Sequence, residues 1–217
     1  MCAARQVEDR LRAEYVELLP AMQRTLTAMT TEVKHVLLSA ILELDRYEQI
    51  LVKGRIKDSE SAIDSLRRRQ QSRSFIDHGE NYSLTTLPDL VGIRVLAFPQ
   101  RRLQDVRRIL EAEPRLTGWK GDPISSPDPT QPPIAFKYHG MWNPTDSFRS
   151  ELQIVSLLIG LFWEVEHSAI YKPTPKLQGI ASSISMKDRN DAVLNALQGF
   201  EQEFDSQIES GFEFPGE

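Results

Sequence analysis

One short apolar run constrains the fold more than any other feature of this sequence. Residues 90–98, LVGIRVLAF, are almost all apolar, rich in branched side chains, and enclosed by Pro88 and Pro99. A compact run of this kind between two prolines is typical of a buried β-strand. The chain is therefore expected to build its core around a sheet.

Amphipathic helical patterns lie on both sides of this run. Apolar residues recur at three- and four-residue steps over residues 8–50, where Pro20 predicts either two helices or one kinked helix. A short helix is predicted to begin near Asp58 or Ser59, either of which is a suitable N-cap. Further helices are predicted over 101–113, over 157–172 with its end at Pro173, and over 187–210.

The second half of the chain supplies further strands. Residues 137–142 and 150–155 are predicted to be two strands paired through the turn NPTDSF, whereas the proline-rich stretch 118–136 is predicted to be a long loop. The order of these elements predicts an α/β fold of the mixed α+β kind. It consists of a mixed sheet flanked by helices, in one domain over residues 1–217.

The composition fits a cytoplasmic protein. The 217 residues carry a formal net charge of −5, which argues mildly against nonspecific coating of nucleic acid. Cys2 is the only cysteine, so neither a disulfide framework nor a cysteine zinc site is expected. The N-terminal residues lack the apolar segment of a signal peptide, and the most apolar stretch, 157–163, is too short to span a bilayer. A cytoplasmic location without membrane contact is therefore expected.

The sequence contains four short constellations of polar residues but none of several common catalytic signatures. The sequence has no Walker A loop, no G-x-G-x-x-G, no G-x-S-x-G and no H-E-x-x-H. In the first constellation, Arg55 and Lys57 precede a helix start that includes Ser61. Two cations beside a helix N-terminus suit a polyphosphate. A solvated basic turn explains the same residues, and it is the commoner case for such a segment alone.

The second and third constellations are ambiguous when taken singly. Asp89 lies at the mouth of the apolar strand, where a carboxylate can bind Mg²⁺ or simply cap the strand. In the segment Lys137-Tyr138-His139-Gly140, the tyrosine ring can stack on a base, or it can be a half-buried side chain of an edge strand.

The fourth constellation is the strongest. The alternation in Glu151-Leu152-Gln153-Ile154 puts the two polar side chains on one face of a strand and the two apolar side chains in the core. A following apolar helix carries a polar face, and buried polar groups need partners. That face consists of Trp163, Glu166, His167 and Tyr171.

In this order, the motifs resemble those of the RelA/SpoT (p)ppGpp synthetase domain. They are R-x-K-x-x-x-S from Arg55, D-φ-x-G-I-R-V from Asp89, Y-x-G-φ from Tyr138, E-φ-Q-I from Glu151 and W-x-x-E-H-x-x-x-Y-K from Trp163. The resemblance covers about residues 44–172 and leaves no room for hydrolase or regulatory domains, so the chain is similar to the small stand-alone alarmone synthetases. It implies a five-stranded mixed sheet with flanking helices, the nucleotidyltransferase-like synthetase fold.

The resemblance implies an ATP-dependent pyrophosphokinase that transfers the β,γ-pyrophosphate of ATP to the 3′-hydroxyl of GDP or GTP. Asp89 and Glu151 would be the catalytic acids that hold Mg²⁺, and Glu151 would also help to deprotonate the hydroxyl. The remaining implied contacts are Arg55, Lys57, Ser61 and Arg68 on the ATP phosphates, and Tyr138, Gln153, His167 and Lys137 on the acceptor, with the Tyr138 ring stacked on its base.

Four features depart from the family pattern and put the grip on ATP and the identity of the acceptor in question. The usual lysine ten residues after the first arginine is Ser65, for which Arg67, Arg68 or Arg69 could compensate. The linker from Lys57 to Asp89 is longer than expected. The usual histidine after the stacking tyrosine is Trp142, and the usual Arg-Thr after the E-φ-Q-I strand is Val155-Ser156.

These departures keep two alternatives open. One is a toxin-like relative that pyrophosphorylates the tRNA 3′-end or makes another alarmone, with an antitoxin protein as partner. The basic stretch LRRRQQSR at 66–73 could seat an RNA backbone, or it could be a solvated helix face. The other is a noncatalytic descendant that binds a nucleotide or a partner, which the loss at Ser65 favours and the retained acids disfavour. The apolar stripe of the C-terminal helix predicts core packing or a homo-oligomer contact.

Overall fold

The chain folds around a five-stranded mixed sheet, as the family resemblance implied. The computed structural model describes residues 2–71, 82–126, 128, 130–166 and 184–210. The strands follow the order β1-β2-β5-β4-β3, in which β2 and β5 are parallel and all other neighbours are antiparallel. Their bounds are β1 (Gln49–Ile56), β2 (Val91–Phe98), β3 (Lys120–Ile124), β4 (Ala135–Gly140) and β5 (Ser150–Ser156).

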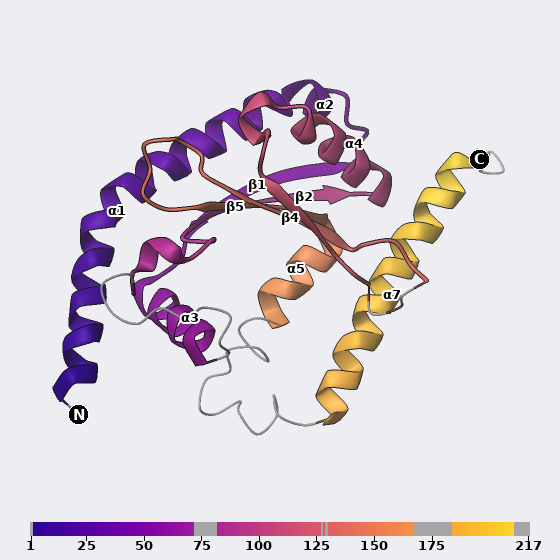
Figure 1. Ribbon diagram of the computed structural model, residues 1–217. Helices are drawn as coiled ribbons and strands as arrows, with labels where there is room; N and C mark the ends of the chain where they lie inside the picture. The colour runs from indigo at the N-terminus through magenta and orange to yellow at the C-terminus, as the bar shows by residue number, and fades with distance from the viewer. Residues whose placement is uncertain (1, 72–81, 127, 129, 167–183, 211–217) are drawn as a thin grey trace.

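One face of the sheet is covered by α1 (Cys2–Val36) and α4 (Gln100–Glu111). Helix α1 continues through Pro20 and curves over the sheet, so the alternative of two helices divided there is wrong (Figure 1). The short helix α2 (Leu38–Leu42) follows it. In β2 and β5, every second residue meets these helices, because successive side chains of a strand point to opposite faces. The core on this side includes Met22, Met29, Val95, Leu103, Val106, Leu152 and Ile154.

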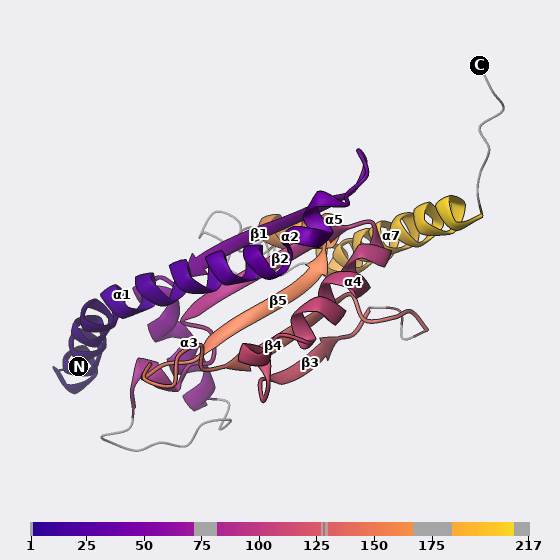
Figure 2. The same ribbon diagram turned by 90° about the horizontal axis from the view of Figure 1, so that it is seen from above.

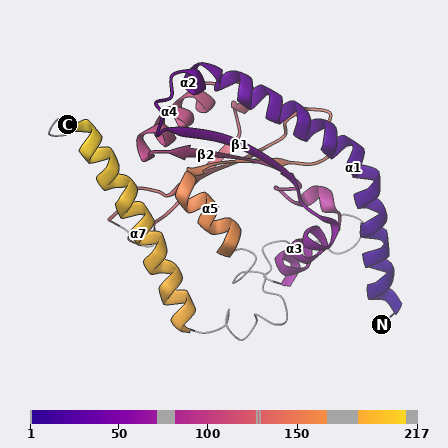
Figure 3. The ribbon, with the colours of Figure 1, turned by 180° about the vertical axis from the view of Figure 1, so that it is seen from behind.

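The helices on the opposite face gather at two places. Helices α5 (Leu157–Glu166) and α7 (Ile184–Glu209) pack near the end of the sheet where β2 and β5 finish. Helix α3 (Ser59–Gln71) follows the end of β1 and lies on the same side of the sheet as α5 (Figures 1 and 3). The smaller core on this side includes Leu96, Ala135, Val155, Ile159 and Leu194.

The proline-rich stretch 118–136 is not wholly the loop that its composition predicts. Residues Lys120–Ile124 form β3, in which Pro123 lies opposite Phe136 of β4. Because β3 is at the edge of the sheet, one of its sides has no neighbouring strand, and a proline is tolerated there. The predicted pairing of 137–142 with 150–155 is confirmed as the antiparallel pair β4–β5.

Short elements connect the strands and helices. The 3-10 turns η1 (Leu84–Thr86) and η2 (Pro114–Leu116) precede β2 and β3. The helix start predicted near Asp58 is confirmed, because Asp58 Oδ1 accepts a hydrogen bond of 2.9 Å from Ser61 N and so caps α3. Of the helices in the described part of the chain, none combines the length and the apolar character needed to cross a membrane.

Candidate active site

The register of the sheet divides the face on the α5 side into two zones. Strands β2 and β5 lie side by side and begin at the same end of the sheet (Figure 2). Where they finish, the cross-strand row Leu51–Leu96–Val155–Ala135 is apolar. Nearer to their start, the same face carries polar rows instead, and we call these rows the polar zone. They are Lys53–Arg94–Gln153–Lys137 and Arg55–Gly92–Glu151–His139–Lys120.

Lys57 and Asp89 form an ion pair at the start of β2. Lys57 Nζ lies 2.5 Å from Asp89 Oδ2, and Lys57 N donates to the Leu90 carbonyl at 2.9 Å. The two side chains are only 12% and 18% exposed. Burial alone would raise the pKa of Asp89, but Lys57, Arg55 and Arg69 outweigh it and hold the pKa below its ordinary value. Asp89 is therefore an ionised carboxylate in surroundings rich in cations.

Arg55 connects the surroundings of Asp89 with those of Glu151. It pairs across the sheet with Gly92, which in turn pairs with Glu151. A Cβ atom at Gly92 would lie 3.7 Å from Arg55 Cγ and Nε and 3.9 Å from the Glu151 carbonyl oxygen, so the arginine side chain lies across the glycine. Arg55 also contributes to lowering the pKa of Asp89. The two acids predicted to share an ion thus have one arginine as a common neighbour.

The other residues predicted to contact ATP lie on α3. Ser61 is in its first turn, where its backbone N–H is bound by the Asp58 cap. Ser65 is buried, and its Oγ accepts a hydrogen bond of 3.3 Å from Arg68 Nη2. Arg68 therefore brings a guanidinium group next to the position where the family pattern has a lysine.

Glu151 and Gln153 share one face of β5, as the alternation predicted, and each is 6% exposed. Arg94 Nε donates to Gln153 Oε1 at 2.9 Å, and Gln153 Nε2 donates to Glu151 Oε1 at 2.6 Å. The second carboxylate oxygen of Glu151 lies 3.8 Å from His139 Nε2. Glu151 is therefore held on one side by an amide and faces a histidine on the other.

Helix α5 borders the polar zone through Glu164. Lys53 Nζ donates to both of its carboxylate oxygens, at 3.0 and 3.1 Å, and Arg94 Nη1 lies 4.0 Å from the same carboxylate. Burial and repulsion by Arg55 lower the pKa of Arg94, against the attraction of Glu164 and Glu151. This edge of the site thus combines cations with a carboxylate that partly neutralises them.

The residues present fit a magnesium ion held mainly by substrate phosphates. No group of three or more metal-ligating His, Cys, Asp or Glu side chains occurs among the described residues. Magnesium needs only one or two carboxylates when phosphate oxygens and water supply the rest. Asp89 Oδ1 is buried and accepts no hydrogen bond from any described residue, so it is an oxygen that lacks the partner a buried polar atom requires.

The predicted stacking role of Tyr138 is wrong, because its side chain lies on the opposite face of the sheet. Tyr138 pairs with Leu152, is 8% exposed, and belongs to the core beneath α1 and α4. Its hydroxyl donates to Glu111 Oε1 on α4 at 2.7 Å. Burial and Glu111 raise the pKa of Tyr138 to about 12. A ring in this position cannot stack on a base bound beside Glu151.

The other acceptor-side predictions have different outcomes. Lys137 lies in the polar zone opposite Gln153 and is half-buried. His167 lies outside the described residues, so its predicted contact is a prediction still. Trp142, which replaces the usual histidine, is a buried core residue packed edge-on against Trp119 at 6.4 Å between ring centroids. The histidine that the structure places beside Glu151 is His139.

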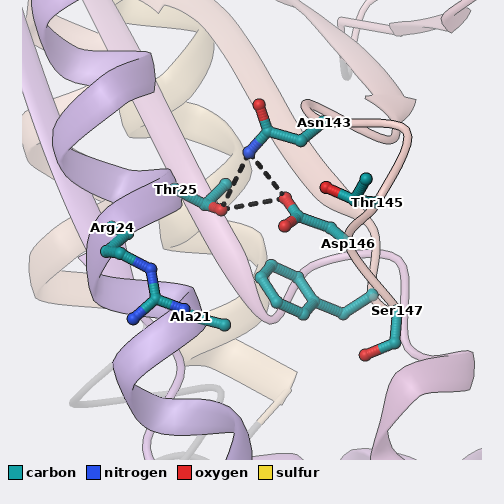
Figure 4. A pocket seen from close by; sticks show the side chains of 8 residues that line it. Ala21, Arg24, Thr25, Asn143, Thr145, Asp146 and Ser147 are labelled. Atoms are coloured by element: carbon teal, nitrogen blue, oxygen red, sulfur yellow. Dashed lines mark hydrogen bonds between the residues drawn. The ribbon is translucent and has the colours of Figure 1, made fainter.

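Two pockets in the described structure lie away from the polar zone. The first, of about 300 Å³, lies between α1 and the β4–β5 turn, where Thr25 Oγ1 donates to Asp146 Oδ2 at 2.9 Å (Figure 4). Asn143 donates to the same carboxylate oxygen at 3.1 Å, which ties the turn to the helix. The second, of about 530 Å³, is lined by Trp119, Trp142 and their neighbours. Neither pocket contains a residue of the predicted site.

Comparison with known proteins shows that this chain is similar in structure to several solved proteins. No protein-family model and no curated protein match the sequence. The small alarmone synthetase 2 from Bacillus subtilis is similar with a TM-score of 0.64 and 12% identity, over 91% of this chain and 99% of that one. The small alarmone synthetase 1 from the same organism, bound to its product pppGpp, gives 0.62 and 15% over 92% and 98%. The chain has the fold of the small alarmone synthetases. A GTP pyrophosphokinase family protein from Streptococcus pneumoniae shares this synthetase fold, with a TM-score of 0.62 and 16% identity over 91% and 94% of the two chains.

Within the synthetase fold, sequence reasoning missed His139 and Lys53 as members of the polar zone. Both could have been found from alternation, because His139 is two residues from Lys137 in β4 and Lys53 is two residues from Arg55 in β1, so each shares a face of its strand with a predicted site residue. The pairing that brings His139 beside Glu151 depends on the β4–β5 register, which the sequence does not specify. The contact of Lys53 with Glu164 joins positions 111 residues apart, for which the sequence carries no signal.

Proposed function

We propose that this protein is an ATP-dependent pyrophosphokinase that transfers the β,γ-pyrophosphate of ATP to the 3′-hydroxyl of GDP or GTP. One observation carries this proposal. In a synthetase fold, the half-buried acid Asp89 and the buried acid Glu151 lie at the shared start of two parallel strands, with Arg55 as their common neighbour and Lys57 paired to Asp89. Among the similar structures, the small alarmone synthetase 1 from Bacillus subtilis is bound to AMPCPP in one and to its product pppGpp in another, which supports nucleotide substrates.

In the proposed reaction the acceptor hydroxyl oxygen attacks the β-phosphorus of ATP. The bond from that phosphorus to the oxygen bridging it to AMP breaks, and AMP leaves with the electron pair. Glu151 would accept the hydroxyl proton through the carboxylate oxygen that Gln153 does not bind. Arg55, Lys57, Ser61 and Arg68 would hold the phosphates, since transfer of this type depends on positioning and charge neutralisation. When bound by Asp89 and Glu151, Mg²⁺ would supply further neutralisation of phosphate charge.

The acceptor would lie over β4 and β5, where Lys137, Gln153 and His139 line the polar zone. His167 remains a proposed neighbour of the acceptor. The alternative of a tRNA acceptor rested on the altered acceptor-side residues and on the basic stretch 66–73. Within that stretch Arg67 donates to Asp64 and Glu8, and Arg68 and Arg69 also have partners within the chain. The carboxylates of Glu8 and Asp64 reduce the charge that Arg67 offers to an RNA backbone, which favours the nucleotide acceptor.

A single assay separates the proposed function from its alternatives. The purified protein is incubated with Mg²⁺ and γ-labelled ATP, in separate reactions with GDP, GTP and bulk tRNA. We expect labelled guanosine tetra- or pentaphosphate and free AMP in the first two reactions. Label in tRNA alone would show that the acceptor is the 3′-end of tRNA and not GDP or GTP. Binding of ATP without turnover of any acceptor would favour the noncatalytic descendant and reject the enzyme.

A further inference from the structure

A hollow where β3 begins and β4 ends takes no part in the proposed chemistry. It has a volume of about 530 Å³. Its lining residues include Arg115, Thr117, Trp119, Gly140, Met141 and Trp142. Gly140 is two residues from Tyr138 in β4, so it shares the face of the sheet opposite the polar zone. The sheet therefore separates this hollow from the candidate active site.

Two tryptophans form a right-angled corner in this hollow. A Cβ atom at Gly140 would lie 2.4 Å from Nε1 of Trp119 and 2.5 Å from its Cδ1 and Cδ2, so the indole ring lies face-on over the bare glycine backbone. The ring of Trp142 stands at 89° to that of Trp119, with 6.4 Å between the ring centroids. Met141, which is 43% exposed, adds an apolar side chain to the lining. The hollow thus offers apolar surfaces in two perpendicular planes.

The hollow also holds hydrogen-bond donors that lack acceptors. The Nε1–H of Trp142 is buried and donates to no described residue, although a buried donor normally has an acceptor. The guanidinium of Arg115 lies 5.4 Å from the centroid of the Trp142 ring, on an exposed side chain that forms no ion pair with any described residue. No carboxylate is among the described lining residues. A ligand that fits would therefore bring acceptors and negative charge.

We propose that this hollow docks a proline-rich segment of a partner protein, with an acidic residue of the segment on Arg115. A segment in the polyproline II conformation has carbonyl acceptors but no N–H at its prolines, and such segments dock in grooves lined by aromatic rings. The puckered proline ring can contact two perpendicular indoles, whereas a flat base can stack on only one of them. This inference is independent of the proposed pyrophosphokinase function.

The chain's own proline-rich stretch does not supply this occupant, because contacts with α7 hold that stretch. Ser126 Oγ donates to Gln198 Oε1 at 2.6 Å, and Gln198 Nε2 donates to the Pro132 carbonyl at 3.0 Å. Gln202 Nε2 also donates to Gln131 Oε1. The same contacts form in every copy of the chain, so the occupant is a separate protein.

Peptide binding to the purified full chain tests this docking site. The probe is a fluorescein-labelled peptide of the repeating sequence Glu-Pro-Pro, and Gln-Pro-Pro and Glu-Ala-Ala repeats serve for comparison. We expect Arg115→Glu to weaken binding of the Glu-Pro-Pro peptide by at least about tenfold and to remove its advantage over Gln-Pro-Pro. Trp119→Ala should weaken both proline peptides by a similar factor. The matched control is Arg46→Glu, at an exposed arginine just before β1, which should change Kd by less than about threefold.

The indole N–H signals give a second readout. Trp119, Trp142 and Trp163 are the three tryptophans of the chain, and each contributes one Nε1–H signal to a ¹H–¹⁵N spectrum. The signals are assigned by their loss in Trp119→Phe and Trp163→Phe. We expect the Glu-Pro-Pro peptide to shift the Trp142 signal, because its N–H gains an acceptor, and to leave the Trp163 signal in place.

Several results would overturn the inference. They are absence of binding at about 1 mM peptide, equal binding of the Glu-Ala-Ala peptide, and an equal loss in Arg115→Glu and Arg46→Glu. AMP is added in a separate titration, and a Trp142 signal that shifts with AMP but not with the peptide would assign the hollow to a nucleobase and reject the docking site. Because Arg115 is exposed, its variant is expected to fold, and it carries the test should Trp119→Ala not fold.

Discussion

An acid that forms an ion pair lies near each end of strand β2. The two acids differ in how many of their carboxylate oxygens accept hydrogen bonds. Near its finish, Glu48 accepts hydrogen bonds from Arg101 Nη2 at 2.7 Å, from Arg102 Nη2 at 2.6 Å and from Asp45 N at 3.0 Å. Each of its carboxylate oxygens therefore has a partner. At the start of β2, one oxygen of Asp89 is bound by Lys57, and the other has no hydrogen-bond partner among the described residues.

Strand β5 repeats the contrast. At its finish, Ser156 Oγ donates to the buried Glu201 of α7 at 2.5 Å, which joins the helix to the sheet. At its start, Glu151 is held by Gln153 through one oxygen and faces His139 at 3.8 Å with the other. Acids whose oxygens are fully bonded serve to hold elements together, whereas acids with a remaining oxygen can still bind a ligand. The same residue type thus serves architecture at one end of the sheet and, in our proposal, chemistry at the other.

The largest effect is expected at the start of β5. Glu151→Gln keeps the shape of the side chain but removes the charge, and we expect the rate of pyrophosphate transfer to fall by about 10³-fold. The control is Asp122→Asn, an exposed acid on the outer strand of the same face, which should change the rate by less than about threefold. Product formation from GDP is the measurement, and a fall of less than about tenfold would place the proton acceptor elsewhere.

The second effect is on stability, at the finish of β2. Glu48→Gln leaves two arginines without their carboxylate, so we expect the free energy of unfolding at pH 7 to drop by about 3 kcal/mol in urea denaturation. Burial raises the pKa of Glu48, but Arg102, Asp45 N and Arg101 outweigh it and lower the pKa to about 2. The difference between the two proteins should therefore shrink as the pH falls from about 4.5 towards 2, because the native carboxylate becomes protonated.

The control for this prediction is Glu43→Gln, an exposed acid close by in the chain, with an expected change within about 0.5 kcal/mol. An equal loss in both variants, or a Glu48 effect that does not depend on pH, would contradict the role of the ion pair.

A smaller effect of opposite sign is expected at Glu201. Burial raises the pKa of Glu201 to about 7, so the native state holds a proton that the unfolded state has released. Stability should then fall as the pH rises from about 4.5 to 7, by about 1–3 kcal/mol. In Glu201→Gln this fall should be smaller, whereas Glu203→Gln, exposed on the same helix, should retain it. Urea denaturation at several pH values measures the slopes, and identical slopes in all three proteins would reject the assignment.

The smallest effect separates the two faces of β4. Tyr138→Phe removes the hydroxyl that donates to Glu111, and we expect a loss of about 1 kcal/mol of stability with KM for the acceptor unchanged. Lys137→Met, one residue away on the polar zone, should raise that KM with little effect on stability. A raised KM in Tyr138→Phe would show that the ring reaches the acceptor after all.

Local patterns predicted the parts of the fold that depend on local physics. The apolar run between Pro88 and Pro99 is β2, and the alternation from Glu151 to Ile154 identified which side chains of β5 are in the core. Asp58 caps α3 as its side chain suggested. The strand β3 was missed because proline and glycine weaken strand propensity, and an edge position that tolerates Pro123 cannot be recognised before the strand order is known.

In the candidate site, too, local patterns predicted some features, whereas features that depend on strand register or long-range contacts were missed. The shared face of Glu151 and Gln153 agrees with the sequence pattern, whereas the ion pair of Lys57 with Asp89 was not predicted. Tyr138 was misplaced because a motif gives a residue type and a position but not the face of the strand, which depends on the register with β5. Long-range contacts such as Glu48 with Arg102 leave no local trace, so their residues looked like ordinary surface charges.

Asp89 and Glu151 are 62 positions apart in the chain, and in our proposal they bind a single ion. Manganese, used in place of magnesium, can be titrated into the protein with a nonhydrolysable ATP analogue and followed by electron paramagnetic resonance. We predict one bound ion in the original protein and in Asp122→Asn, and loss of that ion in both Asp89→Asn and Glu151→Gln. An ion retained with unchanged affinity in either of these two variants would contradict the shared site.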